Sequence, residues 1–214
     1  RDSIEGDELD VYQKMFQVSL EERDQVLKPL AESGNEAVGS MGDDTPMAVL
    51  SSRERSLYDF FRQKFAQVTN PPIDPLREAI VMSLEVDLGG EGNLFEEIEG
   101  HARRVSLTSP VLSQGKFESI LALNESGFKV QVIDSTYDPE VTTLKVALET
   151  LCQEAASRVV GGTSVLVLSD RSIDESRIPV HSLLATGAVH HHLITQGLRA
   201  DSNLIIETGS ARDS

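Results

Sequence analysis

The most constraining stretch of this chain is a helical pattern flanked by two short β-branched runs near the C-terminus. Val165–Leu168 and Leu204–Ile206 are apolar and short enough to be buried strands, and the segment between them has a long apolar periodicity. This order predicts a parallel βαβ unit. A right-handed crossover would place both strands in one sheet, with the helix covering a face of that sheet.

The same alternation begins at about residue 103. Phe128–Ile133 fits a further strand, and a helix opened by Asp138-Pro139 and closed by Gly161-Gly162 follows it. Val105–Leu107 and Lys116–Leu123 fit a shorter strand and a shorter helix. The order strand, helix, strand, helix, strand predicts an α/β fold with a parallel βαβαβ sheet, of a partial-barrel or doubly wound type.

The first hundred residues are dominated by helix signals instead. Ser19–Glu22 and Ser51–Glu54 have capping-box spacing, and Gly34 is a natural helix terminator. Asp74-Pro75 is a good N-cap and first-turn pair. We therefore expect one domain over residues 1–214 with one continuous core, in which a helix-rich part at about 9–102 packs on an α/β part at about 103–214.

The charge balance limits the partners of the chain. Its 214 residues carry 19 Lys and Arg against 35 Asp and Glu, a formal net charge of −16. Duplex nucleic acid and anionic membranes attract basic surfaces, so neither is an expected partner. No run of about twenty apolar residues is present, so we expect no membrane span. The chain begins at Arg1 without a signal-like stretch, and we expect a piece of a larger protein.

Cys152 is the only cysteine of the sequence. One cysteine cannot form a disulfide framework or an all-cysteine iron–sulfur site within the chain. Because it lies among apolar residues of a predicted helix, we expect a small buried side chain rather than a nucleophile.

The consecutive His190, His191 and His192 invite a metal interpretation. Neighbouring side chains on a helix project about 100° apart, so these three cannot chelate one ion. We therefore expect a structural role for the segment and no metal site. Gly187 in the same predicted helix indicates close packing against a neighbour, because glycine there costs about 1 kcal/mol relative to alanine.

Polar side chains follow the predicted strands at their carboxyl ends, where parallel α/β folds usually place their chemistry. They are Asp134, Ser169-Asp170-Arg171 and Glu207-Thr208. An independent enzyme acting at this edge is one interpretation. Pairing of Asp170 with Arg171, or capping of nearby helices, is the other. No phosphate-binding glycine motif and no serine-hydrolase motif accompanies these residues, which favours the structural interpretation.

Gly39–Pro46 is the most unusual loop of the sequence, with the adjacent acids Asp43 and Asp44 among glycines. Such acids can ligate Mg²⁺ or Ca²⁺, but the spaced ligands of a calcium loop are missing. Two interpretations stay open for this loop. One is turn geometry with capping, and the other is a rigid loop presented to another domain.

Several long phrases, in their order, resemble the central domain of the large chain of glutamate synthase. The phrases include GSMGDDTP (39–46), QVTNPPIDPLRE (67–78), LSDR (168–171), GAVHHHLI (187–194) and ETG-AR (207–212). The match runs from about Met15 to Arg212, nearly the whole chain. In that family the central domain follows a glutaminase domain with an N-terminal cysteine nucleophile. It precedes a synthase barrel that carries FMN and an iron–sulfur cluster.

The resemblance implies a non-catalytic connecting domain of an oxidoreductase of glutamate biosynthesis and nitrogen assimilation. In this family, ammonia released from glutamine passes through an internal tunnel to 2-oxoglutarate in the barrel, and the central domain contributes wall to the tunnel. The implied partners are the glutaminase and FMN-binding synthase domains of the same polypeptide. Neither FMN nor the cluster is expected in this chain. The implied location is cytoplasmic, or a plastid for a ferredoxin-dependent plant or algal parent.

Two stiff loops are candidates for the tunnel wall within this resemblance. Gly39–Thr45 and Val68–Asn70 carry polar side chains beside backbone restricted by glycine and proline. The candidate wall residues are Ser40, Thr45, Thr69 and Asn70.

Two hypotheses from other classes compete with the connecting domain: an independent α/β enzyme acting at its strand ends, and a free-standing acidic interaction module. A sheet edge filled by internal contacts would contradict the enzyme hypothesis. A large exposed apolar surface would favour a domain of a multidomain protein.

Overall fold

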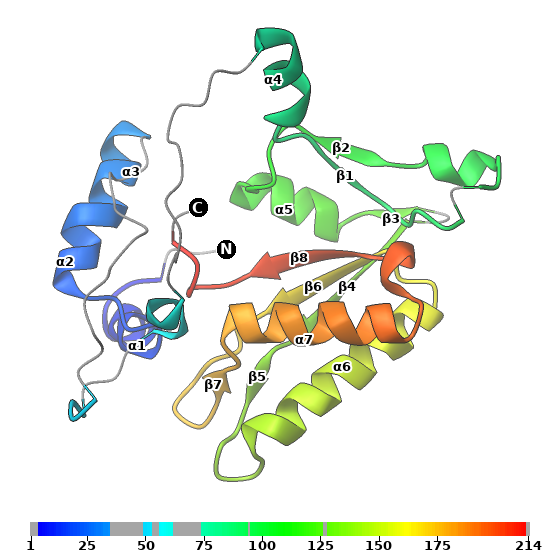
Figure 1. Cartoon of the computed structure of the whole chain (residues 1–214). Helices are drawn as coiled ribbons and strands as arrows, with labels where there is room; N and C mark the ends of the chain where they lie inside the picture. The colour runs from blue at the N-terminus through cyan, green and yellow to red at the C-terminus, as the bar shows by residue number, and fades with distance from the viewer. Residues whose placement is uncertain are drawn as a thin grey trace. The chain divides into compact units, whose positions relative to one another are not determined.

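The computed structural model describes residues 4–34, 49–52, 56–61, 74–93, 95–125 and 128–212. The chain forms two compact units (Figure 1). The first comprises Arg1–Pro71 with Gly209–Ser214, and the second comprises Pro72–Thr208. Among the described helices, none is long and apolar enough to cross a membrane.

A four-stranded sheet in the order β3–β4–β6–β8 forms the centre of the second unit. Its strands are β3 (Asn124–Glu125), β4 (Phe128–Asp134), β6 (Val165–Ser169) and β8 (Asn203–Glu207). β4, β6 and β8 run parallel, and β3 joins β4 in an antiparallel pair. The parallel βαβαβ sheet predicted from the sequence is confirmed.

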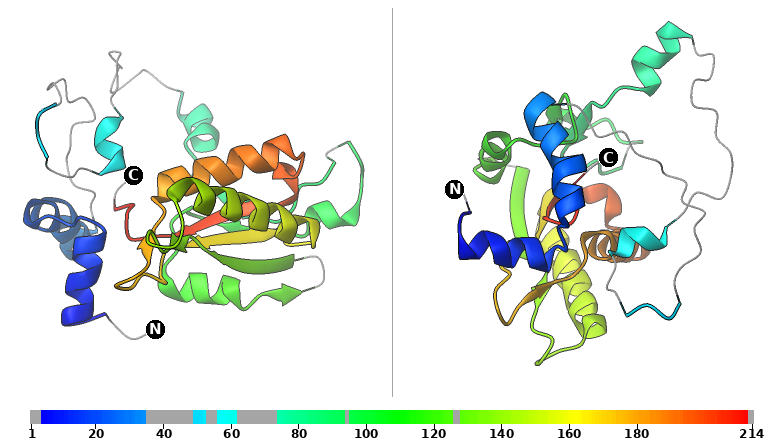
Figure 2. Two further views of the ribbon diagram at one scale, coloured as in Figure 1. Left: turned by 90° about the horizontal axis from the view of Figure 1, so that it is seen from below. Right: turned by 90° about the vertical axis from the view of Figure 1, so that its left-hand side faces the viewer.

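Helices α6 (Leu144–Val160) and α7 (Ser182–Thr195) connect the parallel strands and cover the same face of the sheet (Figure 2). The strand order follows the chain order, so the described sheet winds in one direction, as a section of a barrel does. A doubly wound sheet would reverse its strand order. Of the two predicted types, the structure therefore has the barrel-like connectivity, in a sheet that stays open.

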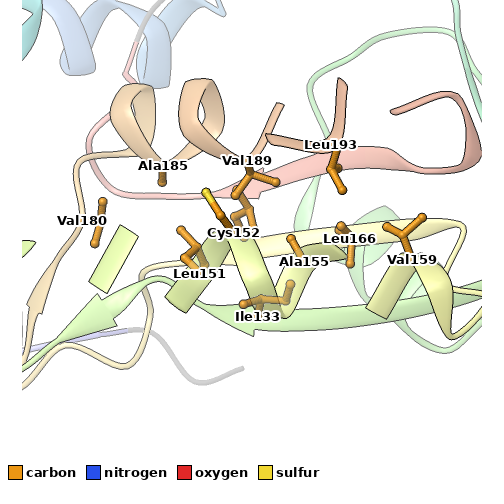
Figure 3. Close-up of a cluster of buried hydrophobic side chains, with 11 residues drawn as sticks. Ile133, Leu151, Cys152, Ala155, Val159, Leu166, Val180, Ala185, Val189 and Leu193 are labelled. Atoms are coloured by element: carbon orange, nitrogen blue, oxygen red, sulfur yellow. The ribbon is translucent and has the colours of Figure 1, made fainter. Parts of the chain in front are cut away.

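The alternation of side chains along β6 divides the apolar core between the two faces of the sheet. All five residues of β6 are buried, as expected for a central parallel strand. Leu166 and Leu168 join the cluster on the α6–α7 side, whereas Val165 joins the cluster on the opposite side. Figure 3 shows residues of α6 and α7, among them Ala155 and Val189, converging over Leu166.

The opposite face of the sheet is covered by α5 (Gln114–Leu121) and by an antiparallel pair of short strands. β1 (Val86–Leu88) pairs there with β2 (Val105–Leu107). β2 and α5 match the predicted elements. β1 was not predicted and lies within the part expected to be helix-rich; it forms because it pairs with β2.

The start of α6 differs from the prediction. The helix begins at Leu144 with Thr143 as its N-cap, where Val146 N donates to Thr143 Oγ1 at 3.4 Å. Asp138 instead caps a turn, since its Oδ1 accepts a hydrogen bond from Glu140 N at 2.8 Å. The β-branched run between that turn and Leu144 explains the delay, because such side chains lose rotamer freedom in a helix.

Other elements complete the second unit. They are α4 (Pro75–Val81), β5 (Thr136–Tyr137) paired with β7 (Ile178–Pro179), and the 3₁₀ turns η3 (Glu99–Ala102) and η4 (Arg199–Asp201). The predicted cap of α4 is confirmed, since Leu76 N donates to Asp74 Oδ1 at 3.0 Å.

The first unit is helical. It contains α1 (Asp7–Met15), α2 (Leu20–Glu22), the π-helical η1 (Arg23–Leu27), α3 (Lys28–Ser33) and the 3₁₀ turn η2 (Leu57–Phe60). Ser19 Oγ accepts from Glu22 N at 3.1 Å, and Gly34 ends α3 with φ 66°, so both predictions are confirmed. The capping box at Ser51–Glu54 lies partly outside the described residues.

Gly209 has a packing reason in the first unit. A Cβ at this position would lie 2.6 Å from the ring of Phe16, so only glycine lets the backbone pass. Arg212 forms an ion pair with Glu22 and donates to the carbonyl oxygen of Phe16. The C-terminal segment is thereby fastened to the turn between α1 and α2.

Candidate functional site

The carboxyl ends of the three parallel strands bring together polar residues that are far apart in the sequence. The register aligns Asp134 of β4 with Ser169 of β6, and Ser169 with Glu207 of β8. The predicted polar edge therefore exists, and its chemistry depends on what these side chains bind.

The polar groups between β6 and β8 bind one another. Ser169 Oγ donates to Glu207 Oε2 at 2.5 Å, and Arg171 Nε lies 3.4 Å from Glu207 Oε1 in an ion pair. Asp170 is only 2 % exposed and accepts a hydrogen bond from Thr208 Oγ1 at 2.5 Å. This part of the edge is filled by internal contacts, which hold the two strand ends together.

Arg177 neutralises the third strand end. Its Nη2 donates to Asp134 Oδ2 at 2.9 Å and to the carbonyl oxygen of Thr136 at 3.0 Å, and its Nε donates to Thr136 Oγ1 at 2.9 Å. Sequence reasoning missed this arginine, because its place beside Asp134 depends on the pairing of β5 with β7. No local sequence pattern predicts that contact.

The loop before Arg177 is fixed by Asp174. Hydrogen bonds from the backbone and the hydroxyl of Ser176 to Oδ1 hold the pKa of Asp174 below its ordinary value. A lowered pKa means that the stabilisation is present above the ordinary pKa of the carboxyl. It is lost as the pH falls through the pKa of the folded state.

A cavity of about 260 Å³ lies beside Asp134 and Arg177. Residues from the end of β4, from β5, from the turn at Asp138 and from α6 line it. It is the part of the strand edge that internal contacts leave open.

Cys152 lies in the core between α6 and α7, where it is 9 % exposed (Figure 3). Burial raises the pKa of its thiol, so the thiolate that a nucleophile needs is disfavoured. The predicted role as a small buried side chain is confirmed.

Alkylation of Cys152 tests this environment. We expect iodoacetamide at mildly alkaline pH to modify the folded chain at least about tenfold more slowly than the urea-unfolded chain, because the thiol is both buried and protonated. Mass spectrometry of timed samples measures the two rates. Equal rates would contradict a buried Cys152.

The histidines serve local structure. His181 Nδ1 accepts from Leu183 N at 3.3 Å at the start of α7, and His190 Nδ1 accepts from Arg199 Nε at 2.9 Å. Among the described residues, no group of three or more His, Cys, Asp or Glu is placed to hold a metal ion. The packing interpretation of Gly187 was wrong, since a Cβ there would meet nothing within 4 Å.

The four candidate tunnel residues, Ser40, Thr45, Thr69 and Asn70, lie outside the described residues, as does the whole loop Gly39–Pro46. Their role in a tunnel therefore stays a prediction.

An exposed apolar face is present on α4. Leu76 is 79 % exposed and Ile80 is 78 % exposed, and Met82 and Leu84 just beyond the helix are exposed as well. Exposed apolar side chains gathered in this way are typical of interaction surfaces.

Comparison with known proteins decides the family. Residues 11–214 match the family model of the glutamate synthase central domain. The chain belongs to the glutamate synthase central domain family. The resemblance noted from the sequence phrases is thereby confirmed.

Relatives of this central domain come from enzymes with different reductants. The chain is 43 % identical over 202 residues to glutamate synthase [NADH] of Schizosaccharomyces pombe, with 92 % of this chain and 10 % of that protein covered. It is 44 % identical over 202 residues to the chloroplastic ferredoxin-dependent glutamate synthase of Oryza sativa subsp. japonica, with 92 % and 12 % covered. For the glutamate synthase [NADPH] large chain of Azospirillum brasilense the identity is 42 % over 204 residues, with 94 % and 13 % covered. The chain thus spans only 10–13 % of the length of these relatives.

In this glutamate synthase central domain, two of the phrases that carried the resemblance meet in space. LSDR ends β6 and ETG-AR follows β8, and Ser169, Asp170 and Arg171 of the first bind Glu207 and Thr208 of the second. The residues of these two phrases therefore link the carboxyl ends of β6 and β8 through side-chain contacts.

Proposed function

We propose that this central domain is a non-catalytic connector between the glutaminase and FMN-binding synthase domains of a glutamate synthase, and that it contributes wall to the intramolecular ammonia tunnel. The parent reaction converts L-glutamine and 2-oxoglutarate into two L-glutamate, with two electrons from a reductant and two protons. Family membership supports a glutamate synthase as the parent enzyme, because the relatives named above are glutamate synthases and this chain spans a small part of their length.

The interlocked edge between β6 and β8 is the observation that carries the non-catalytic role. Asp170 is buried on Thr208, and Glu207 is engaged by both Ser169 and Arg171, so these groups are held by one another. A catalytic edge needs a nucleophile within reach of a base and open to a substrate. This arrangement argues against an independent enzyme acting at that edge.

The exposed apolar face of α4 supports a connecting domain over a free-standing interaction module. Leu76 and Ile80 lie on a seven-residue helix whose described side chains include none that is buried. Covering these side chains by a neighbouring domain would remove their apolar area from water, at about 25 cal/mol per Å².

The cofactors of the parent are assigned to its other domains. An iron–sulfur cluster needs several cysteine thiolates, and Cys152 is the only cysteine of the chain. The residues of this chain therefore do not fit an iron–sulfur cluster.

A substitution in the candidate tunnel wall tests the proposal in the full enzyme. We expect Thr69→Phe to uncouple the two sites, so that glutamine is hydrolysed without matching glutamate formation while added ammonia is still used. The ratio of glutamate formed to glutamine consumed measures the coupling: it is two when the released ammonia reaches 2-oxoglutarate and one when glutamine is only hydrolysed. The physical reason is that an aromatic ring blocks a narrow passage without altering either active site.

Thr69→Val is the matched control, because valine has nearly the shape of threonine and should keep the passage open. Formation of two glutamate per glutamine at a normal rate in Thr69→Phe would contradict the assignment of Thr69 to the tunnel wall. Loss of ammonia-dependent synthesis in the same variant would instead indicate damage to the synthase domain.

A further inference from the structure

We propose that the cavity at the end of β4 binds a small organic cation, a primary ammonium group on a short alkyl chain. This cavity lies wholly within the second unit, between the β4–β5 segment and the first turns of α6. The proposal goes beyond the connecting role and does not depend on it.

The size of the cavity sets the size of the ligand. Its volume of about 260 Å³ corresponds to roughly nine water molecules at about 30 Å³ each. Pockets for drug-sized ligands start at about 300 Å³. A ligand of a few carbon and nitrogen atoms fits, whereas a single ion would leave most of the space unfilled.

Ser135 is a buried residue that brings a hydroxyl group to the lining of the cavity. The residue is 6 % exposed and lines the cavity. Its N–H donates to Ser169 O, and its carbonyl oxygen accepts from Val180 N, both at 2.8 Å. The hydroxyl itself forms no hydrogen bond within the described part of the chain. A ligand in the cavity can supply the hydrogen-bond partner that this hydroxyl lacks.

The charge of the lining selects a cation. Asp138 uses Oδ1 to accept from Glu140 N, and Glu154 uses Oε1 to accept from Arg158. Each of the two carboxylates keeps its second oxygen without a hydrogen bond among the described residues. Among the described residues of the lining, Arg177 is the one cationic side chain, and it is paired with Asp134. Glu154 is paired with Arg158, so the carboxylate of Asp138 leaves the lining with a net negative charge, which attracts a cation and repels an anion.

The apolar part of the lining selects an organic cation over a metal ion or ammonium itself. Val141, Ala147, Leu151 and Val180 contribute side chains without hydrogen-bonding groups. A short alkyl chain can bury its surface against them. The ammonium head, which has three donors, would find acceptors among the carboxylate and hydroxyl oxygens of the lining.

Titration of the 214-residue chain with n-butylamine, followed by ¹H–¹⁵N NMR, tests the site. At pH 7 and about 150 mM salt, non-specific attraction to the acidic surface is largely screened. We expect saturable shifts confined to amides of residues 134–154 and 177–180. n-Butanol, which lacks the charge, and ammonium chloride, which lacks the chain, should each bind at least about tenfold more weakly.

Two variants connect the binding to the cavity. Glu154→Gln removes one carboxylate, and Ser135→Ala removes the unpartnered hydroxyl. We expect each to weaken butylamine binding about fivefold or more, with an unchanged NMR fold pattern. Glu149→Gln is the matched control, because Glu149 lies on the same helix and pairs with Lys145 as Glu154 pairs with Arg158, but does not line this cavity.

Three results would overturn the proposal. One is the absence of saturable binding of butylamine. The second is binding of n-butanol as strong as that of butylamine, which would show that the charge is irrelevant. The third is an equal loss in Glu149→Gln and Glu154→Gln, which would indicate a diffuse attraction to the acidic surface rather than a site.

Discussion

Replacement of Leu193 by alanine is expected to lower the free energy of unfolding of the chain by about 2–5 kcal/mol. Leu193 is completely buried on the inner face of α7, in the cluster that packs α6 and α7 on the sheet (Figure 3). Truncation removes its buried methyl groups and leaves a cavity that the close-packed neighbours cannot fill. Urea denaturation followed by circular dichroism measures the change.

Ile194 is the matched control for this prediction. It is the next residue on the same helix but is 50 % exposed. Ile194→Ala should therefore cost about 1 kcal/mol or less. Equal losses at the two positions would mean that α7 does not present Leu193 to the core as described.

The second large loss of stability is expected at the side-chain contacts between the ends of β6 and β8. Asp170→Ala should lower the free energy of unfolding by about 1.5–3 kcal/mol, because it removes a buried, charged acceptor from its hydrogen bond with the Thr208 hydroxyl. Thr208 would lose the acceptor of its hydroxyl, and β6 and β8 would lose a side-chain link at their carboxyl ends. The midpoint of urea unfolding reports the loss.

Asp170→Asn and Glu175→Ala calibrate this measurement. Asparagine keeps the shape of the side chain and one acceptor oxygen, so Asp170→Asn should lower the free energy of unfolding less than Asp170→Ala does. Glu175 is an exposed acid of the loop that follows β6, and its removal should change stability by about 0.5 kcal/mol or less. An unchanged unfolding midpoint in Asp170→Ala would contradict a structural role for the LSDR and ETG phrases.

The sequence predicted the central sheet well, because the strands and helices near the C-terminus are long, apolar and bounded by clear caps. β4, β6 and α7 depend on periodicities that local residues impose by themselves. β1 and the start of α6 were missed or misplaced. The first needs its partner β2, and the second reflects a competition between two capping residues, Asp138 and Thr143.

The amino-acid sequence alone was therefore enough to predict the α/β class, the buried position of Cys152 and, through its phrases, the family. The polar contacts at the strand ends became visible only in the folded chain. Ser169 with Glu207, Asp170 with Thr208 and Arg177 with Asp134 are pairs between distant segments. Strand register and loop closure select such partners, and neither can be predicted from short stretches of one sequence.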